Sequence, residues 1–239
     1  PDIVGTSSAR RYRDVMHYTE LSTPALTIDL EVLERNLDRM ARLCRGQGVG
    51  LRPHIKTHKT PEVARMQLGH GALGLTVAKV GEAEVFGEAG FDEILVAFPI
   101  FGTEKLRRLA TLARNRTLLV SLDHEATAME LSQAAVSQKA MIGVLVEFDA
   151  GFHRCGLRPG PDCVALAKKI EKMPGLRFRG LMTYFGNVWG PREDREREAR
   201  QVAAEVAKAR AVFADAQMPV EILSGGSTPS AEFAGLISG

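Results

Sequence analysis

The 239-residue sequence lacks several features that would point to a compartment or a macromolecular partner. It has three cysteines, Cys44, Cys155 and Cys163, which exclude a disulfide framework and show no metal-type pair spacing. No apolar run approaches the roughly 18 residues needed to cross a bilayer, and the N-terminus is polar, without the apolar core of a secretory signal. A reduced, cytoplasmic compartment is therefore expected.

An excess of charge of one sign is also missing. Lysine and arginine total 31 against 29 aspartate and glutamate, which leaves a formal net charge of +2. The basic residues do not gather into one tract, so neither a nucleic acid nor a membrane is indicated as a partner. A composition of 45% hydrophobic and 25% charged residues is typical of one globular domain with a substantial core.

Short apolar runs alternate with amphipathic stretches along the whole chain. Strands are predicted over residues 24–30, 48–52, 72–77, 93–97, 117–122, 141–148, 176–183 and 220–223. Helices are predicted over residues 31–45, 60–68, 79–89, 103–113, 124–136 with Asp123 as N-cap, 161–172 and 192–214. The charged run 192–200 is read as a solvated helix face.

This alternation predicts an α/β fold of the (β/α)8 TIM-barrel type. The strands are rich in β-branched residues and continuously apolar, which suits parallel strands covered on both faces. Eight βα units over about this length match the size of such a barrel. A doubly wound open sheet is the alternative, but the G-x-G-x-x-G fingerprint after the first strand is absent.

A lysine lies at a junction where barrels place their chemistry. The segment 51–61 (L-R-P-H-I-K-T-H-K-T-P) joins the second predicted strand to a helix, with Lys56 at its centre. Loops after the strands form the active sites of such barrels. Neighbouring positive charge and partial burial would favour a free amine, which can form a Schiff base with an aldehyde. Lys56 is therefore the candidate electrophile-capturing residue.

Three later strand ends complete a pattern. They lead into 147–156 (E-F-D-A-G-F-H-R-C-G), into Tyr184, and into 224–229 (S-G-G-S-T-P). Backbone N–H groups of a Gly-Gly-Ser turn before a helix can bind phosphate, and barrels favour phosphate sites after strands seven and eight. An amine, a phosphate turn and an aromatic ring together indicate a site for pyridoxal 5′-phosphate.

The segment after the sixth strand supplies both shape and charge. Arg154 is expected to face the cofactor's phenolate oxygen or a carboxylate, where a fixed guanidinium serves well. Asp149 and Gly151 are expected to shape the turn, since glycine permits a close backbone approach. Cys155 is read as a packing residue rather than a nucleophile.

These segments resemble those of the fold-type III pyridoxal-phosphate enzymes, whose barrel is of the alanine racemase N-terminal type. Within that group the sequence is similar to the D-threonine aldolase and D-serine dehydratase family. R-P-H-I-K-T-H-K at 52–59 resembles the family's cofactor-lysine motif, and A-K-V-G-E-A-E at 78–84 its usual continuation. The segment 147–156 resembles the D-x-G-x-x-R-x-G element, and 224–229 the phosphate loop. The four matches occur in the family's order and cover nearly the whole chain.

The resemblance implies roles for individual residues. Lys56 would be the Schiff-base lysine, Arg154 the partner of the phenolate oxygen and Tyr184 a neighbour of the pyridine ring. The phosphate would be bound by the turn residues Ser224, Gly225, Gly226, Ser227 and Thr228. Residues 1–239 would form the cofactor-binding barrel.

The resemblance also implies a part that these residues do not supply. Family members carry a β-rich C-terminal domain, expected here beyond residue 239, in which a His with an Asp or Cys binds a divalent metal such as manganese or zinc. That domain completes the site in a homodimer. No metal ligand is assigned within the chain, and His54 and His58 are read as groups that support Lys56.

The implied activity is that of a lyase acting on a small β-hydroxy-D-amino acid. A D-threonine aldolase type of reaction would yield glycine and an aldehyde, whereas a D-serine dehydratase type would yield a keto acid and ammonia. Amino-acid racemisation and a non-catalytic pyridoxal-phosphate carrier remain alternatives. The aldolase is the preferred reading.

Overall fold

The computed structural model describes residues 17–238, so the polar segment 1–16 and Gly239 lie outside the description. The chain divides into two compact units, residues 1–35 and 36–239. The first unit contains a 3-10 helix, Tyr18–Glu20, and the start of α1 (Leu30–Gly46). Asp29 Oδ1 accepts a hydrogen bond from the Val32 N–H at 3.0 Å and so caps the first turn of α1. Within residues 17–238 no helix is long and apolar enough to cross a membrane.

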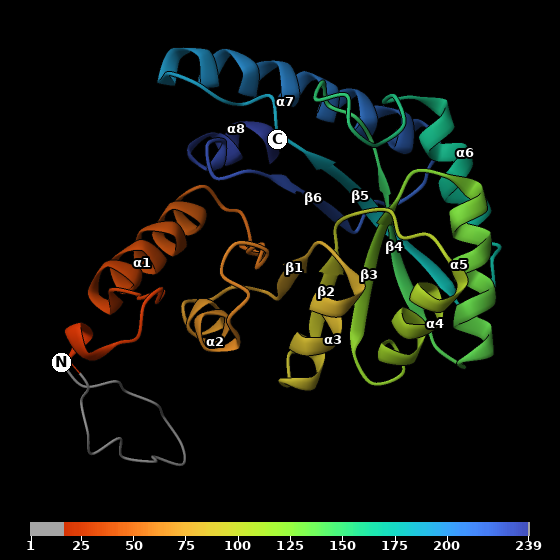
Figure 1. Cartoon of the computed structure of the whole chain (residues 1–239). Helices are drawn as coiled ribbons and strands as arrows, with labels where there is room; N and C mark the ends of the chain where they lie inside the picture. Colours follow the sequence, from red (N-terminus) through yellow and green to blue (C-terminus); the bar gives the residue numbers. More distant parts are fainter. Residues whose placement is uncertain (1–16, 239) are drawn as a thin grey trace. The chain divides into compact units, whose positions relative to one another are not determined.

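The second unit is built on a parallel sheet of six strands that pair in chain order. The strands are β1 (Leu75–Val77), β2 (Glu93–Val96), β3 (Thr117–Leu122), β4 (Ile142–Glu147), β5 (Leu176–Tyr184) and β6 (Ile222–Gly226). The helices are α2 (Pro61–Gly69), α3 (Val80–Glu88), α4 (Thr103–Leu112), α5 (Glu125–Ser137), α6 (Pro161–Ile170), α7 (Arg192–Asp215) and α8 (Ala234–Ser238), the last preceded by a 3-10 helix, Ala231–Phe233. Figure 1 shows the sheet curling with α3 to α7 on its outer side.

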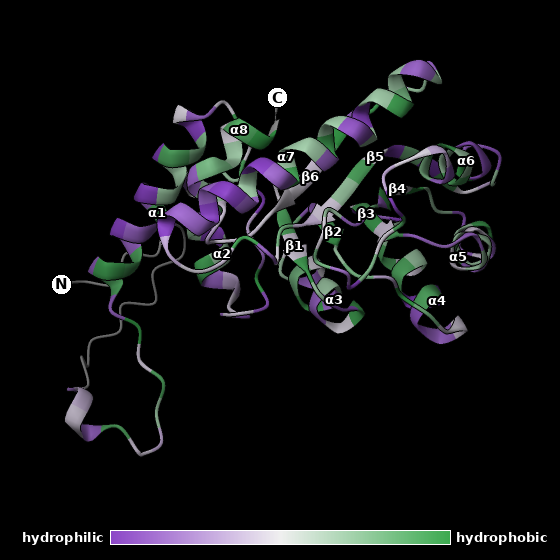
Figure 2. Ribbon diagram, turned by 90° about the horizontal axis from the view of Figure 1, so that it is seen from above, coloured by the Kyte–Doolittle hydropathy of each residue, from purple (hydrophilic) through white to green (hydrophobic). Residues whose placement is uncertain are grey.

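The sheet is apolar on both faces, as the continuous hydrophobic runs predict. On the outer face, buried residues such as Val96, Val120 and Val146 belong to one large core with the helices. On the inner face, Leu95, Leu119, Leu145 and Met182 form a second, smaller cluster. Figure 2 shows hydrophilic and hydrophobic stretches alternating along α7, whose apolar residues belong to the outer core. The predicted α/β class with βα alternation is confirmed, in the form of a curled half-barrel.

Two of the eight predicted strands are wrong. Residues 24–30 form no strand, and Leu26 in this segment is 96% exposed. Residues 48–52 are also not a strand, although the chain just after them touches β1 through an isolated bridge between His54 and Thr76. Pro53 accepts a hydrogen bond from the Thr76 N–H at 2.8 Å but has no N–H to donate, so a regular ladder cannot continue through it.

The predicted N-cap of α5 is off by one residue. His124 is the cap, and its Nδ1 accepts a hydrogen bond from the Ala126 N–H at 3.2 Å. Asp123 is directed instead to a distant loop, where its Oδ2 accepts a hydrogen bond from the Gly156 N–H at 2.7 Å. A residue that looked like a local helix signal therefore contributes to the candidate site.

Candidate active site

Lys56 lies on a turn, residues 53–60, that runs from the β1 edge of the sheet to α2. Two backbone bonds define this turn: the Ile55 N–H donates to Thr76 O at 2.9 Å, and the Lys59 N–H donates to Ile55 O at 2.9 Å. Lys59 has a φ of 52°, an uncommon value for a residue other than glycine. Ile55 is fully buried, whereas Lys56 is exposed, so the expected partial burial of Lys56 is wrong.

Two histidines support the same turn from within. Burial, followed by the nearby charge of Lys56, lowers the pKa of His54 to about 4. His54 is therefore neutral near pH 7, and its Nδ1 accepts a hydrogen bond from the Lys56 N–H at 3.3 Å. Burial also lowers the pKa of His58, whose Nδ1 accepts a hydrogen bond from the Thr60 N–H at 3.1 Å. Between residues 17 and 238, no three His, Cys, Asp or Glu side chains gather as a metal site would require.

Arg154 lies on a second turn, between Asp149 and Gly156, which follows β4. Asp149 Oδ1 accepts hydrogen bonds from three successive backbone N–H groups, those of residues 151, 152 and 153, at 2.9, 2.9 and 3.0 Å. Burial alone would raise the pKa of Asp149, but these bonds and the His153 ring outweigh burial and the pKa is lowered. The prediction that Asp149 shapes this turn is confirmed.

The base of the second turn is closed by strand-like contacts. Phe148 and Leu157 form an isolated parallel bridge, and Asp123, the residue just after β3, accepts a hydrogen bond from the Gly156 N–H. Gly156 has a φ of 105°, and a Cβ on it would lie 2.5 Å from the backbone carbon of Phe148. Three residues therefore fix the shape of this turn: Asp149 inside it, Asp123 beside it, and Gly156, which no other residue can replace without strain.

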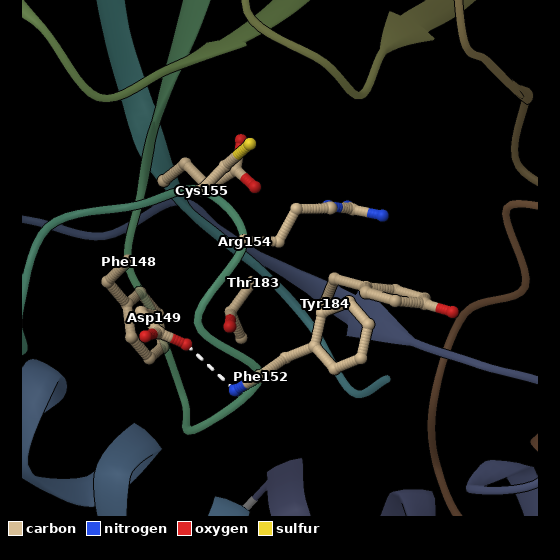
Figure 3. A pocket seen from close by; sticks show the side chains of 8 residues that line it. Phe148, Asp149, Phe152, Arg154, Cys155, Thr183 and Tyr184 are labelled. Atoms are coloured by element: carbon tan, nitrogen blue, oxygen red, sulfur yellow. Dashed lines mark hydrogen bonds between the residues drawn. The ribbon is translucent and has the colours of Figure 1, made fainter. Parts of the chain in front are cut away.

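Tyr184, at the end of β5, brings the two turns together. The Arg154 Cζ lies 4.4 Å from the centre of the Tyr184 ring, and the Lys56 Nζ lies 5.8 Å from the same centre. Phe152 meets the ring edge-on, with centroids 5.1 Å apart. Figure 3 shows the Arg154 guanidinium extended beside the Tyr184 ring. Three residues predicted from separate segments thus form one cluster.

The predicted phosphate turn adjoins this cluster through the sheet, and its first part is not a turn: Ser224, Gly225 and Gly226 are the last residues of β6, and only Ser227 and Thr228 follow the strand. Tyr184 pairs with Gly226 in the β5–β6 ladder. Gly226 has a φ of 131°, and nothing lies within 4 Å of the place where a Cβ would stand. Ser224 is half-buried in β6, while Gly225 and Thr228 are exposed. The open, backbone-rich edge of β6 is therefore accessible to a ligand beside Tyr184.

The same turn is held rigidly from behind. The Ser227 N–H donates to Ser230 Oγ at 2.9 Å, and the Ser227 hydroxyl donates to Phe185 O at 3.2 Å. Arg195 of α7 donates to Pro229 O at 3.2 Å and forms an ion pair with Glu232 at 2.8 Å. The charged run 192–200 was predicted to be a solvated helix face. For Arg195 this prediction is wrong, because its side chain binds Pro229 and Glu232.

A small pocket lies under the second turn and contains polar groups that sequence reasoning gave no role. It is lined by Glu147, Phe148, Asp149, Phe152, Arg154, Cys155, Thr183 and Tyr184 (Figure 3). Glu147 is 2% exposed and its Oε2 accepts a hydrogen bond from the Ser121 hydroxyl at 2.7 Å. Burial raises the pKa of Glu147. The sequence did contain one indication of this role: Glu147 is the charged last residue of the otherwise apolar strand β4.

Two further pocket groups behave differently. The Thr183 hydroxyl is buried and has no hydrogen-bond partner among the described residues. Burial raises the pKa of the Cys155 thiol, which keeps it protonated and fits the packing role expected from the sequence. Thr183 continues the buried run of β5, and a threonine is an ordinary strand residue. Nothing in the local sequence therefore marks it as part of a site.

The donor set fits pyridoxal 5′-phosphate. A primary amine and a guanidinium lie over one aromatic ring, and an open glycine-containing turn lies next to that ring on the adjacent strand. An amine can bind an aldehyde, a ring can pack on a pyridine, and a backbone turn can bind a phosphate. Lys56, Arg154, Tyr184 and the 224–228 turn are the residues that could hold it.

Comparison with known proteins agrees with this geometry. The family model described as alanine racemase, N-terminal domain, matches residues 28–237. The chain belongs to the alanine racemase N-terminal domain family. The fold predicted from the motifs is therefore confirmed, and membership in this family implies pyridoxal 5′-phosphate as the cofactor.

Relatives of this chain include proteins named as aldolases and dehydratases. A D-threonine aldolase from Arthrobacter sp. is 38% identical over 89% of the chain and 57% of its own length. A D-threo-3-hydroxyaspartate dehydratase from a Delftia species is 35% identical over 92% of the chain and 58% of its own length. The crystal structure of a D-threonine aldolase from Filomicrobium marinum superposes with a TM-score of 0.88 at 37% identity, covering 91% of this chain and 59% of that one. The predicted resemblance to this group is confirmed, and the chain spans less than two thirds of these relatives.

Proposed function

We propose that this alanine racemase N-terminal domain belongs to a pyridoxal-phosphate-dependent lyase that cleaves β-hydroxy-D-amino acids, of the D-threonine aldolase type. The observation that carries the proposal is the convergence of Lys56 and Arg154 on the Tyr184 ring, beside the open turn at Gly226. The identities of 38% and 37% to two D-threonine aldolases support the aldolase type.

In this proposal each residue has a separate task. The Lys56 amine binds the cofactor's aldehyde carbon, and the exposed position of Lys56 leaves it accessible to substrate. Arg154 places a permanent positive charge beside the ring, where it stabilises a phenolate by a charge-assisted hydrogen bond. Tyr184 packs against the pyridine. The phosphate is received at Ser224, Gly225, Gly226, Ser227 and Thr228, through those backbone N–H groups that are not already bonded; the Ser227 N–H is bonded to Ser230 Oγ.

The cofactor and a metal supply chemistry that these side chains lack. When bound, pyridoxal phosphate acts as an electron sink for the bond that breaks at the substrate Cα. We further propose that residues 1–239 are the cofactor-binding half-barrel of a homodimeric enzyme, and that a β-rich domain beyond residue 239 binds manganese or zinc. A divalent metal there would polarise the β-hydroxyl of the substrate.

Product analysis tests the reaction. The protein, extended through any following domain, is incubated with D-threonine and with D-serine, and glycine plus aldehyde and keto acid plus ammonia are quantified. We expect glycine plus acetaldehyde from D-threonine, abolished by a chelator and restored by manganese. Keto acid plus ammonia as the main products would instead identify a dehydratase, the activity named for the Delftia relative. Racemisation without cleavage, or no turnover at all, would reject the lyase proposal.

A further inference from the structure

The turn that carries Lys56 also carries a second amine, Lys59, only three residues later. The two side chains have different partners. The Lys56 Nζ lies over the Tyr184 ring, whereas the Lys59 Nζ forms an ion pair with Glu82 of α3. Half of the Lys59 side chain, 53%, is exposed, so solvent and small reagents reach it. Two accessible primary amines therefore lie on one short turn. Binding of the aldehyde by one of them requires a feature that favours that amine over the other.

Glu82 is unusual among the acidic residues because it is buried, with a residue exposure of 6%. Both of its carboxylate oxygens have partners: Oε1 binds the Lys59 Nζ, and Oε2 accepts a hydrogen bond from the Ala78 N–H at 2.8 Å. Burial alone would raise the pKa of Glu82, but the Lys59 and Ala78 hydrogen bonds and the charges of Lys59 and Lys79 lower it. Glu82 is thus a fixed anion at the start of α3.

The Lys59–Glu82 ion pair connects two of the motifs found in the sequence. Glu82 lies in the segment A-K-V-G-E-A-E at 78–84, and Lys59 closes R-P-H-I-K-T-H-K at 52–59. The two motifs follow one another in the sequence, and their pattern alone predicts no task for Lys59 or Glu82. The ion pair is the contact that joins them, and its charge also reaches His54, whose pKa the Glu82 carboxylate raises against the larger effect of burial.

We propose that Glu82 selects Lys56 as the amine that captures the cofactor's aldehyde, by holding the Lys59 Nζ in an ion pair while the Lys56 Nζ lies over the Tyr184 ring. This inference rests on the proposed function, because it takes Lys56 to be the cofactor lysine. Glu82 and Lys59 are positioning residues in this scheme and touch neither cofactor nor substrate.

The chemistry requires such a selection. To capture an aldehyde, the neutral amine nitrogen adds its lone pair to the carbonyl carbon and gives up its two protons. These leave with the carbonyl oxygen as water, so that the C=O bond is replaced by a C=N bond. In the ion pair the Lys59 Nζ donates a hydrogen bond to the Glu82 carboxylate, which keeps that nitrogen from approaching a carbonyl carbon. Lys56 has no such carboxylate among its contacts in the described part of the chain and is the amine left to react.

Chemical trapping tests the selection without relying on turnover. The purified protein is mixed with pyridoxal phosphate, reduced with borohydride and digested, and the pyridoxyl group is located by mass spectrometry. In the wild type we expect the label on Lys56. In Glu82→Gln, which keeps the side-chain shape and the acceptor for the Ala78 N–H but loses the charge, we expect labelling of Lys59 to rise by about tenfold relative to Lys56.

A matched control separates this effect from the general loss of an ion pair. Lys169 pairs with Glu125 across α6 and α5, and its side chain is also 53% exposed, but its carboxylate partner is 43% exposed rather than buried. Glu125→Gln should leave the pyridoxyl group on Lys56 and change the labelling of Lys169 by less than about twofold. Glu82→Gln combined with Lys59→Met should return the label to Lys56 alone, because the competing amine is gone.

A second measurement on the wild type covers the case in which Glu82→Gln does not fold. Competitive acetylation at neutral pH should modify Lys59 about tenfold more slowly than the exposed Lys105 of α4. Equal acetylation rates, or an unchanged label on Lys56 in folded Glu82→Gln, would overturn the inference while leaving the proposed function intact. A wild-type label on a residue other than Lys56 would overturn the proposed function itself.

Discussion

The two turns that meet at Tyr184 hold their cations by different means. The Arg154 turn is organised from within, because Asp149 accepts hydrogen bonds from three of the turn's own N–H groups. The Lys56 turn also has internal hydrogen bonds, to His54 and His58, but it is tied to other elements as well: Thr76 of β1 binds its backbone and Glu82 of α3 binds Lys59. A permanently charged guanidinium can be fixed by a loop that supplies most of its own hydrogen bonds. The reactive amine of Lys56 is instead positioned with the help of neighbouring elements, and one of these, α3, also binds the second amine of the turn, Lys59.

The largest effect should come from removing the amine while keeping a cation over Tyr184. Lys56→Arg preserves positive charge beside the ring but cannot form a stable bond to an aldehyde. We expect no pyridoxyl label at position 56 after borohydride reduction and loss of lyase turnover, with an unfolding free energy within about 0.5 kcal/mol of the wild type. Covalent labelling and turnover at wild-type levels in Lys56→Arg would show that the amine is not needed.

The internal anchor of the second turn should matter most for stability. Asp149→Ala leaves three backbone N–H groups without their acceptor, and we expect a loss of about 3 kcal/mol in the free energy of unfolding, since each bond to a charged group contributes about 1.5–3 kcal/mol and such bonds are not additive. Urea unfolding measures it. Asp149→Asn keeps an acceptor oxygen and should lose clearly less. Equal losses in both variants would mean that the carboxylate shape, and not its hydrogen bonding, organises the turn.

Acid should weaken the Lys56 turn before the Arg154 turn. The folded pKa of His54, about 4, lies below its ordinary value, so the unfolded chain binds the proton more readily as the pH falls from about 6.5 to 4. Stability from neutral His54 is therefore lost across that window, by about 1–2 kcal/mol because the ring is only partly buried. Asp149, whose pKa is also lowered, keeps its contribution until the pH falls below the ordinary aspartate range.

Unfolding curves at several pH values check this order. The wild type and His54→Asn should differ in slope between pH 6.5 and 4 and run parallel above pH 7. Identical slopes in the two proteins would show that His54 titrates in the folded state as it does in the unfolded chain.

The smallest effect concerns the stacking of Arg154. Arg154→Lys keeps the charge but loses the planar contact with Tyr184, and an exposed cation–π contact is worth roughly 0.5–1 kcal/mol. We expect the dissociation constant for pyridoxal phosphate to rise about two- to fivefold in a fluorescence titration. Tyr184→Phe retains the ring face and is the control. A change of a hundredfold in Arg154→Lys would indicate a direct contact with the phosphate.

The same contrast between the turns explains how far the sequence could be interpreted. The spacing of Asp149, Gly151 and Gly156 is local, so the second turn and its shaping residues followed from sequence. β3 was predicted at its observed bounds, Thr117–Leu122, because its continuous apolar run lies between clear helix signals. The convergence of Lys56, Arg154 and Tyr184 was inferred from the rule that strand ends meet at one edge of a barrel.

Long-range features were less accessible. Residues 48–52 have the composition of a strand, yet Pro53 interrupts the ladder with β1, and this effect depends on where the partner lies. Asp123 was predicted to be a helix cap. Its hydrogen bond with Gly156 could not be predicted locally, because the two residues are 33 positions apart in the sequence. The Lys59–Glu82 pair and the buried Glu147–Ser121 pair likewise join segments that only the folded sheet brings together.

A crystal structure of the protein after loading with pyridoxal phosphate and reduction with borohydride would test the central claim most directly. We expect continuous density from the Lys56 Nζ to the cofactor, a pyridine ring against Tyr184, Arg154 beside the phenolate oxygen and the phosphate at the Ser224–Thr228 turn. Lys59 should still be paired with Glu82. Density joined to Lys59 or Lys79, or a phosphate bound away from the β6 turn, would contradict the assignment of this site.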